Sequence, residues 1–129
     1  MNQAILMVDD EAILLMSMRQ ELKLKYGTRY LYETALNAEQ GLEAIQRLVT
    51  DGITVVLVIS DWLMPGMKGD EFLRIVHKRY PEVKLIMISG HADDSQMKEL
   101  ADSIKLCAFL RKPYGSRNLF KVLESALAE

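Results

Sequence analysis

The chain has 129 residues, of which 50% are hydrophobic and 26% are charged, which is typical of one soluble globular domain with its own core. Its formal net charge of −2 gives no electrostatic reason to expect nucleic-acid binding. The apolar runs are shorter than the roughly 18 residues that a membrane span needs, and Met1-Asn2-Gln3 lacks the basic start of a signal peptide. The single cysteine, Cys107, excludes a disulfide within the chain and favours a reducing cytoplasm.

Short apolar runs alternate with amphipathic runs along the chain. Strands are predicted at Ala4–Val8, Tyr30–Ala35, Thr54–Ser60, Lys84–Ser89 and Leu106–Leu110. Helices are predicted between and after them, from apolar residues at helical spacing: Leu14, Met18 and Leu22; Leu42, Ile45 and Val49; Phe72, Ile75 and Val76; Met97, Leu100, Ala101 and Ile104; Leu119, Val122, Leu123, Ala126 and Leu127. We expect Asn37 to cap the second helix, the third to end before Pro81, and Cys107 to pack in the core.

Five strands alternating with five helices predict an α/β domain with a parallel sheet covered by helices on both faces. The apolar run from Val55 to Ile59 supports this interpretation, because a strand buried on both faces shows no polar alternation. For five strands the common doubly wound order is 2-1-3-4-5, the flavodoxin-like (βα)5 three-layer sandwich. We therefore expect one domain over residues 1–129.

Polar side chains stand where the predicted strands end. The first strand is followed by Asp9-Asp10 and the third by Asp61, while the fourth ends in Ser89 and the fifth runs into Lys112. In open α/β sheets, ligands bind at the carboxyl ends of the strands, where the strand order reverses. Carboxylates gathered there repel, because two unit charges about 4 Å apart interact by roughly 4 kcal/mol at an effective dielectric of about 20.

Protonation, a cation or both must offset that repulsion. Carboxylates without nearby His or Cys ligands suit Mg²⁺, which keeps several waters and takes one or two carboxylates. Lys112 supplies a further positive charge and Ser89 a hydroxyl. Such groups around one carboxylate form a site for a transferring phosphoryl group, with Asp61 as the nucleophile that becomes an aspartyl phosphate.

Over essentially its whole length, the chain resembles the receiver domain of two-component response regulators. The resemblance rests on four segments: Val8-Asp9-Asp10-Glu11, Asp61-Trp62-Leu63-Met64-Pro65-Gly66-Met67, Ser89-Gly90 and Phe109-Leu110-Arg111-Lys112-Pro113. An acidic pair or a Lys-Pro pair alone is weak support for this family. The ordered set is specific, because each member stands at the end of its own predicted strand.

The resemblance implies a phosphoacceptor signalling domain rather than an enzyme, one that assists its own phosphorylation and dephosphorylation. Asp61 would accept phosphate from a histidine kinase or a histidine phosphotransfer protein. Asp9 and Asp10 would hold Mg²⁺, Asp10 more directly. Asp61 and the backbone carbonyl of Leu63 would complete the protein ligands.

The resemblance also implies a switch. Ser89 would bind a phosphoryl oxygen, and Lys112 would pair with Asp61 before phosphorylation and with the phosphate after it. Phe109 matches the switch position whose ring turns inward, although the family often has tyrosine there. The change would be displayed on the fourth helix, fifth strand and fifth helix, where a downstream effector or a second copy in a homodimer would bind. Lys112-Pro113 would be a cis peptide, and neither direct nucleic-acid binding nor membrane association is implied.

In this family, the residues two positions after the acceptor and two after the serine tune the phosphate lifetime. Here they are Leu63 and His91. Leu63 cannot orient a hydrolytic water, whereas a histidine can. We therefore expect slow to moderate self-dephosphorylation.

Two other functions fit parts of the pattern. A phosphatase of the haloacid-dehalogenase type uses a strand-end aspartate, Mg²⁺, a hydroxyl and a lysine, but it needs a second aspartate where this chain has Leu63. A pseudo-receiver would keep the fold and bind partners without phosphorylation. The complete set of site residues argues against this function.

Acids such as Glu11 also suit the start of a helix, because they complement its dipole.

Overall fold

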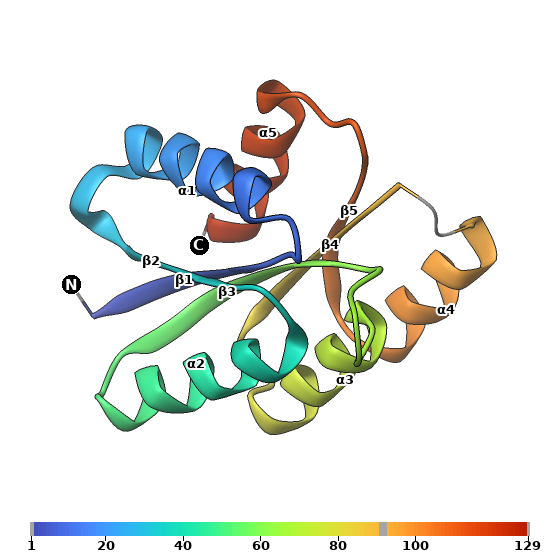
Figure 1. Cartoon of the computed structure of the whole chain (residues 1–129), viewed down its shortest axis with the longest axis horizontal. Coiled ribbons are helices and arrows are strands. Elements are labelled where there is room, and N and C mark those ends of the chain that lie inside the picture. The colour runs from blue at the N-terminus through green and yellow to red at the C-terminus, as the bar shows by residue number, and fades with distance from the viewer. Residues whose placement is uncertain (1, 91–92, 129) are drawn as a thin grey trace.

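A computed structural model describes residues 2–90 and 93–128 of the chain (Figure 1). The strands are β1 (Gln3–Val8), β2 (Leu31–Ala35), β3 (Thr54–Asp61), β4 (Lys84–Ser89) and β5 (Leu106–Arg111). The helices are α1 (Ala12–Tyr26), α2 (Ala38–Thr50), α3 (Gly69–Arg79), α4 (Asp94–Ser103) and α5 (Ser116–Leu127), and the 3-10 helix η1 (Gly27–Arg29) follows α1. Every strand lies within one residue of its predicted bounds. Across the two described ranges, no helix combines the length and the apolar character that crossing a bilayer requires.

The sheet has the predicted parallel order, β2-β1-β3-β4-β5. Helices α1 and α5 lie on one face of the sheet, and α2, α3 and α4 lie on the other (Figure 1). β1 and β3 are neighbours, with Val8 opposite Ser60. The chain therefore leaves both strands at the same point of the sheet edge, which brings the residues after Val8 next to Asp61.

The apolar core has one layer on each side of the sheet. Between the sheet and α2–α4, fully buried side chains include Ile45, Phe72 and Leu100. On the other side, Leu22 of α1 and Leu123 of α5 pack against the strands. Most of the predicted apolar stripes of the helices therefore face the sheet.

Three local predictions are confirmed: a helix cap, a helix end and a cis peptide bond. The Asn37 side chain accepts a hydrogen bond of 2.8 Å from the backbone N–H of Gln40, which caps α2. α3 ends at Arg79, before Pro81. The Lys112-Pro113 peptide bond is cis, as expected.

Three predictions of burial are wrong. Cys107 is exposed, because the pairing between β4 and β5 passes from Leu106 directly to Ala108 and leaves Cys107 out of register. Val49, at the end of the α2 stripe, is 47% exposed. Ala101 is also exposed, and Leu100 is the buried side chain of α4.

Helix α1 carries apolar side chains on two faces. Its sheet-facing side chains are Leu15, Met18 and Leu22, so the predicted stripe is shifted by one residue at its start, where Leu14 is only half-buried. A second set faces solvent, with exposed fractions of 84% for Ile13, 69% for Met16 and 81% for Leu24. A second apolar face of this size on one helix is a candidate contact surface.

The loop between β3 and α3 closes tightly on the end of β3. The backbone N–H of Gly69 donates a 2.7 Å hydrogen bond to the carbonyl of Trp62. A Cβ on Gly69 would lie 2.1 Å from the carbonyl oxygen of Asp61 and 2.9 Å from the Cα of Trp62. Glycine at position 69 is therefore required for the backbone to pass beside Asp61.

We predict that Gly69→Ala destabilises the fold by about 2–4 kcal/mol, because the added methyl group meets rigid backbone. Chemical denaturation of purified protein measures this change. Gly115→Ala is the control for an added methyl group, because a Cβ at Gly115 would meet no described atom within 4 Å. Equal costs for the two substitutions would contradict the close approach at Gly69.

Candidate functional site

Asp61 is the last residue of β3, whereas the prediction placed it one residue after the end of the strand. The N–H of Trp62 donates to the carbonyl of Ile88 on β4 at 3.0 Å, and the Ser60 hydroxyl donates to the Asp61 carbonyl at 2.9 Å. These bonds fix the backbone on both sides of Asp61. Its carboxylate is therefore presented from a rigid strand end rather than from a mobile loop.

Three carboxylates meet at this edge of the sheet. One oxygen each from Asp9, Asp10 and Asp61 lies within 4.8 Å of the other two. Asp9 and Asp61 are buried, and Asp10 is exposed. Hard oxygen donors at this spacing, open to solvent on one side, fit a Mg²⁺ ion that keeps part of its water shell.

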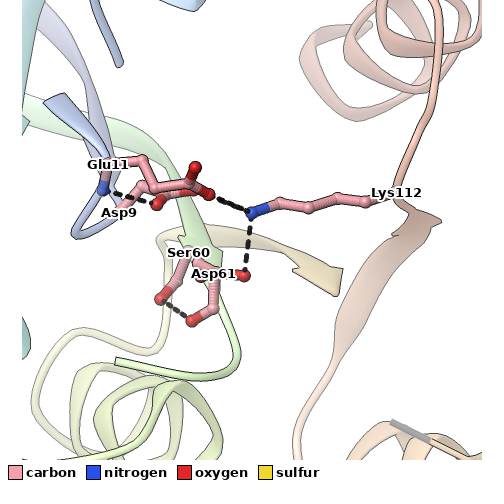
Figure 2. Close-up of polar contacts among 5 residues, drawn as sticks. All are labelled: Asp9, Glu11, Ser60, Asp61 and Lys112. Carbon is pink, nitrogen blue, oxygen red and sulfur yellow. Dashed lines mark hydrogen bonds and ion pairs between the residues drawn. The ribbon is translucent and has the colours of Figure 1, made fainter. Parts of the chain in front are cut away.

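The ammonium of Lys112 lies among the carboxylates (Figure 2). Its Nζ is 3.4 Å from Asp61 Oδ1, 3.3 Å from Asp9 Oδ2 and 3.4 Å from Glu11 Oε1. The sequence interpretation of Glu11 as a helix acid missed this contact, and within the described residues its side chain makes no capping bond in α1. One positive charge therefore serves three carboxylates.

Burial, together with this imbalance of charge, shifts the pKa values of these groups. Burial, and secondarily the charge of Asp9, raise the pKa of Asp61 to about 6, although Lys112 opposes the shift. Burial also raises the pKa of Asp9 above its ordinary value, against the lowering effects of the Glu11 N–H and Lys112. Burial by itself lowers the pKa of Lys112, but the charges of Asp61 and Asp9 outweigh it and raise that pKa.

Two of the other candidate residues lie at or beside the same edge. Ser89 is buried at the end of β4, where its carbonyl accepts a 3.0 Å hydrogen bond from the N–H of Lys112. Leu63 lies in the loop after Asp61, and its side chain is 43% exposed. His91 falls outside the described residues, so the predicted phosphate lifetime stays a prediction.

Phe109 belongs to a series of contacts that leads away from the site. Its ring centroid lies 6.2 Å from that of Trp62, the residue after Asp61. The guanidinium of Arg111 lies 6.0 Å from the Phe109 ring on the same strand, and it pairs with Asp94 at the start of α4. The Arg111–Asp94 pair could not be predicted from the sequence, because nothing in either segment specifies which strand end α4 approaches.

Comparison with known proteins identifies the family. The family model of the response regulator receiver domain matches residues 5–124 of this chain. This chain is a receiver domain. Receiver domains act in two-component and chemotaxis signalling and are phosphorylated by histidine kinases.

Individual relatives of this receiver domain differ in length. The chemotaxis protein CheY1 of Helicobacter pylori is 32% identical over 127 residues, which cover 95% of each chain. The sensor kinase CckA of Brucella abortus is 31% identical over 98% of this chain, but the match spans only 13% of that protein. The match to the HoxA regulator of Cupriavidus necator spans 24% of that protein.

Solved structures show the same fold. The signal receiver domain of an HD domain-containing protein from Pseudomonas fluorescens has a TM-score of 0.83 and 27% identity, with 98% of this chain and 95% of that chain covered. The chemotaxis protein CheY4 of Vibrio cholerae has a TM-score of 0.82 and 26% identity, with 98% and 99% covered.

The raised pKa of Asp61 gives a pH prediction for the metal-free protein. Because its pKa is about 6 when folded and 3.8 ordinarily, the folded state holds a proton that the unfolded state has already lost between these values. Stability therefore falls as the pH rises through this window, by about 3 kcal/mol in total at about 1.36 kcal/mol per pKa unit. Asp61→Asn removes this loss, since it cannot ionise.

We expect Asp61→Asn to be more stable than wild type by roughly that amount near pH 8 in a chelator, with the difference disappearing below about pH 4. Denaturant titrations of both proteins across this range measure it. A difference that does not depend on pH would mean that the charge of Asp61 is not its cause.

Proposed function

We propose that this domain accepts a phosphoryl group on Asp61 from a phosphohistidine of a histidine kinase or a histidine phosphotransfer protein. The observation that carries the proposal is the contact of Lys112 with Asp61 and Asp9, at 3.4 and 3.3 Å, at the carboxyl edge of a parallel sheet. An Asp61 oxygen attacks phosphorus while the bond from phosphorus to the donor's imidazole nitrogen breaks. The electron pair of that bond stays on the nitrogen.

Each group of the site has a role in this proposal. Lys112 pairs with the carboxylate before transfer and with the phosphoryl oxygens after it. The Ser89 hydroxyl bonds a phosphoryl oxygen. Asp9, Asp10 and Asp61, with the Leu63 carbonyl, hold Mg²⁺, which when bound neutralises charge on the transferring group.

The output surface is proposed to be α4, β5 and α5. The Trp62–Phe109 contact and the pairing of Arg111 with Asp94 connect the neighbourhood of Asp61 to α4. A small movement of Ser89 and Phe109 would therefore be felt at α4, where an effector or a second copy would bind. The exposed apolar face of α1 begins beside Asp10 and supports a protein, rather than only small molecules, as phosphodonor.

The remaining expectations belong to the same proposal. We assign the whole chain, residues 1–129, to the receiver domain, supported by the family match and by elements that run from Gln3 to Leu127. The unpaired Cys107 supports a cytoplasmic location. The acidic site and the net charge of −2 support a function without direct nucleic-acid or membrane binding.

We predict that acetyl phosphate with Mg²⁺ adds one phosphoryl group to the protein, detected as a single mass increase in intact-protein mass spectrometry. Asp61→Asn abolishes the adduct, and Lys112→Met slows its formation by at least about tenfold, because an ammonium that stabilises transition-state charge typically contributes this much or more. Omission of Mg²⁺ also prevents labelling.

The rival functions give different results in the same assay. Continuous hydrolysis of phosphate esters would support the phosphatase, whose second aspartate is replaced here by Leu63. A wild-type protein that stays unlabelled at saturating donor, while it still binds partner proteins, would support the pseudo-receiver. Ser60→Ala serves as a control variant near the site, since its hydroxyl bonds only a backbone carbonyl among the described contacts.

A further inference from the structure

Lys112 has one exposed partner and two buried ones. The side chains of Asp9 and Asp61 are 4% and 8% exposed, whereas that of Glu11 is 66% exposed. All three approach the ammonium at 3.3 to 3.4 Å (Figure 2). Among the three carboxylates that contact Lys112, Glu11 is therefore the one whose charge borders solvent.

The position of Lys112 does not depend on Glu11. Asp9 and Asp61 hold the ammonium from the sheet side, and the N–H of Lys112 is bonded to the Ser89 carbonyl. The hydrogen bond that residue 11 donates to Asp9 Oδ1, at 2.9 Å, comes from its backbone N–H and survives a side-chain substitution. The side chain itself accepts a longer bond of 3.4 Å from Lys112 Nζ. The Glu11 side chain therefore contributes charge to the site more than structure.

We propose that Glu11 is a specificity-determining residue, which disfavours small anionic phosphodonors such as acyl phosphates at Asp61. The inference rests on the proposed function and deepens it. With acetyl phosphate, an Asp61 oxygen forms the new bond to phosphorus, the bond from phosphorus to the acetate oxygen breaks, and acetate leaves with that electron pair. The reaction needs no other reactant and no proton.

The selection follows from charge. A small donor carries its negative charges past the Glu11 carboxylate and gains little other contact with the protein. A phosphohistidine on a protein donor meets the same carboxylate, but contacts elsewhere on the two proteins offset the repulsion. Since Glu11 is exposed, added salt screens its effect.

The test compares Glu11→Gln with wild type, using acetyl phosphate and Mg²⁺ at low ionic strength and intact-protein mass spectrometry. We expect the initial labelling rate of Asp61 to rise by roughly threefold to tenfold, from the Coulomb energy of an exposed charge near a multiply charged donor. Glu39→Gln is the matched control, because Glu39 is an exposed acid in the first turn of α2. The two substitutions change the net charge of the protein by the same amount. Glu11→Asp, which keeps the charge, stays close to wild type.

Two further readouts separate charge from structure. The rate advantage of Glu11→Gln shrinks as salt is added, and it is smaller with phosphoramidate, which carries less negative charge than acetyl phosphate. A purely structural role for Glu11 would change neither trend. Circular dichroism and the denaturation midpoint establish that the variant is folded like wild type.

Failure of the Glu11 inference and failure of the proposed function would give different results. If wild type is labelled on Asp61 and Glu11→Gln is no faster, or if Glu39→Gln is accelerated equally, the selection by Glu11 is wrong and the phosphoacceptor function stands. If wild type gives no adduct on Asp61 with either small donor and none with a histidine phosphodonor protein, the proposed function and this inference fail together.

Discussion

The site depends on one ammonium group that lies among more negative charge than it can balance. Lys112 contacts Asp61, Asp9 and Glu11, and Asp10 stands beside them without a charge of opposite sign in the same cluster of described contacts. Buried carboxylates in such an arrangement are costly when ionised. The site is therefore suited to take up a proton, a metal ion or both.

The rest of the fold makes this arrangement possible. The strand order places β1 beside β3, so that Asp9 and Asp61 leave the sheet together, and β5 beside β4, so that Lys112 reaches across from the edge strand. Two apolar layers hold the sheet rigid beneath the charges. Gly69 lets the loop after Asp61 fold back against the strand. The core that fixes the position of Asp61 therefore also buries its carboxylate, and this burial raises its pKa.

Much of this could be predicted from the sequence, for identifiable reasons. The alternation of apolar strands with amphipathic helices determines the α/β class, and strand-end residues such as Asp61 and Lys112 point to the edge where the site lies. Burial in detail was harder: Cys107 has apolar neighbours, yet a register shift between β4 and β5 turns it outward. Side-chain partners between distant segments were harder still. The contact of Glu11 with Lys112 and the pair formed by Arg111 and Asp94 depend on how loops approach one another, which periodicity does not report.

The most direct test of the central claim is the titration of the Asp61 carboxyl carbon by NMR, in metal-free wild type and in Lys112→Met. The account predicts a midpoint near the raised pKa of about 6 in wild type, and a still higher midpoint when the ammonium is removed. An Asp61 that titrates like an ordinary aspartate in wild type would contradict the claim that its carboxylate is buried among more negative charge than Lys112 offsets. The same midpoint in both proteins would contradict the claim that Lys112 offsets part of that charge.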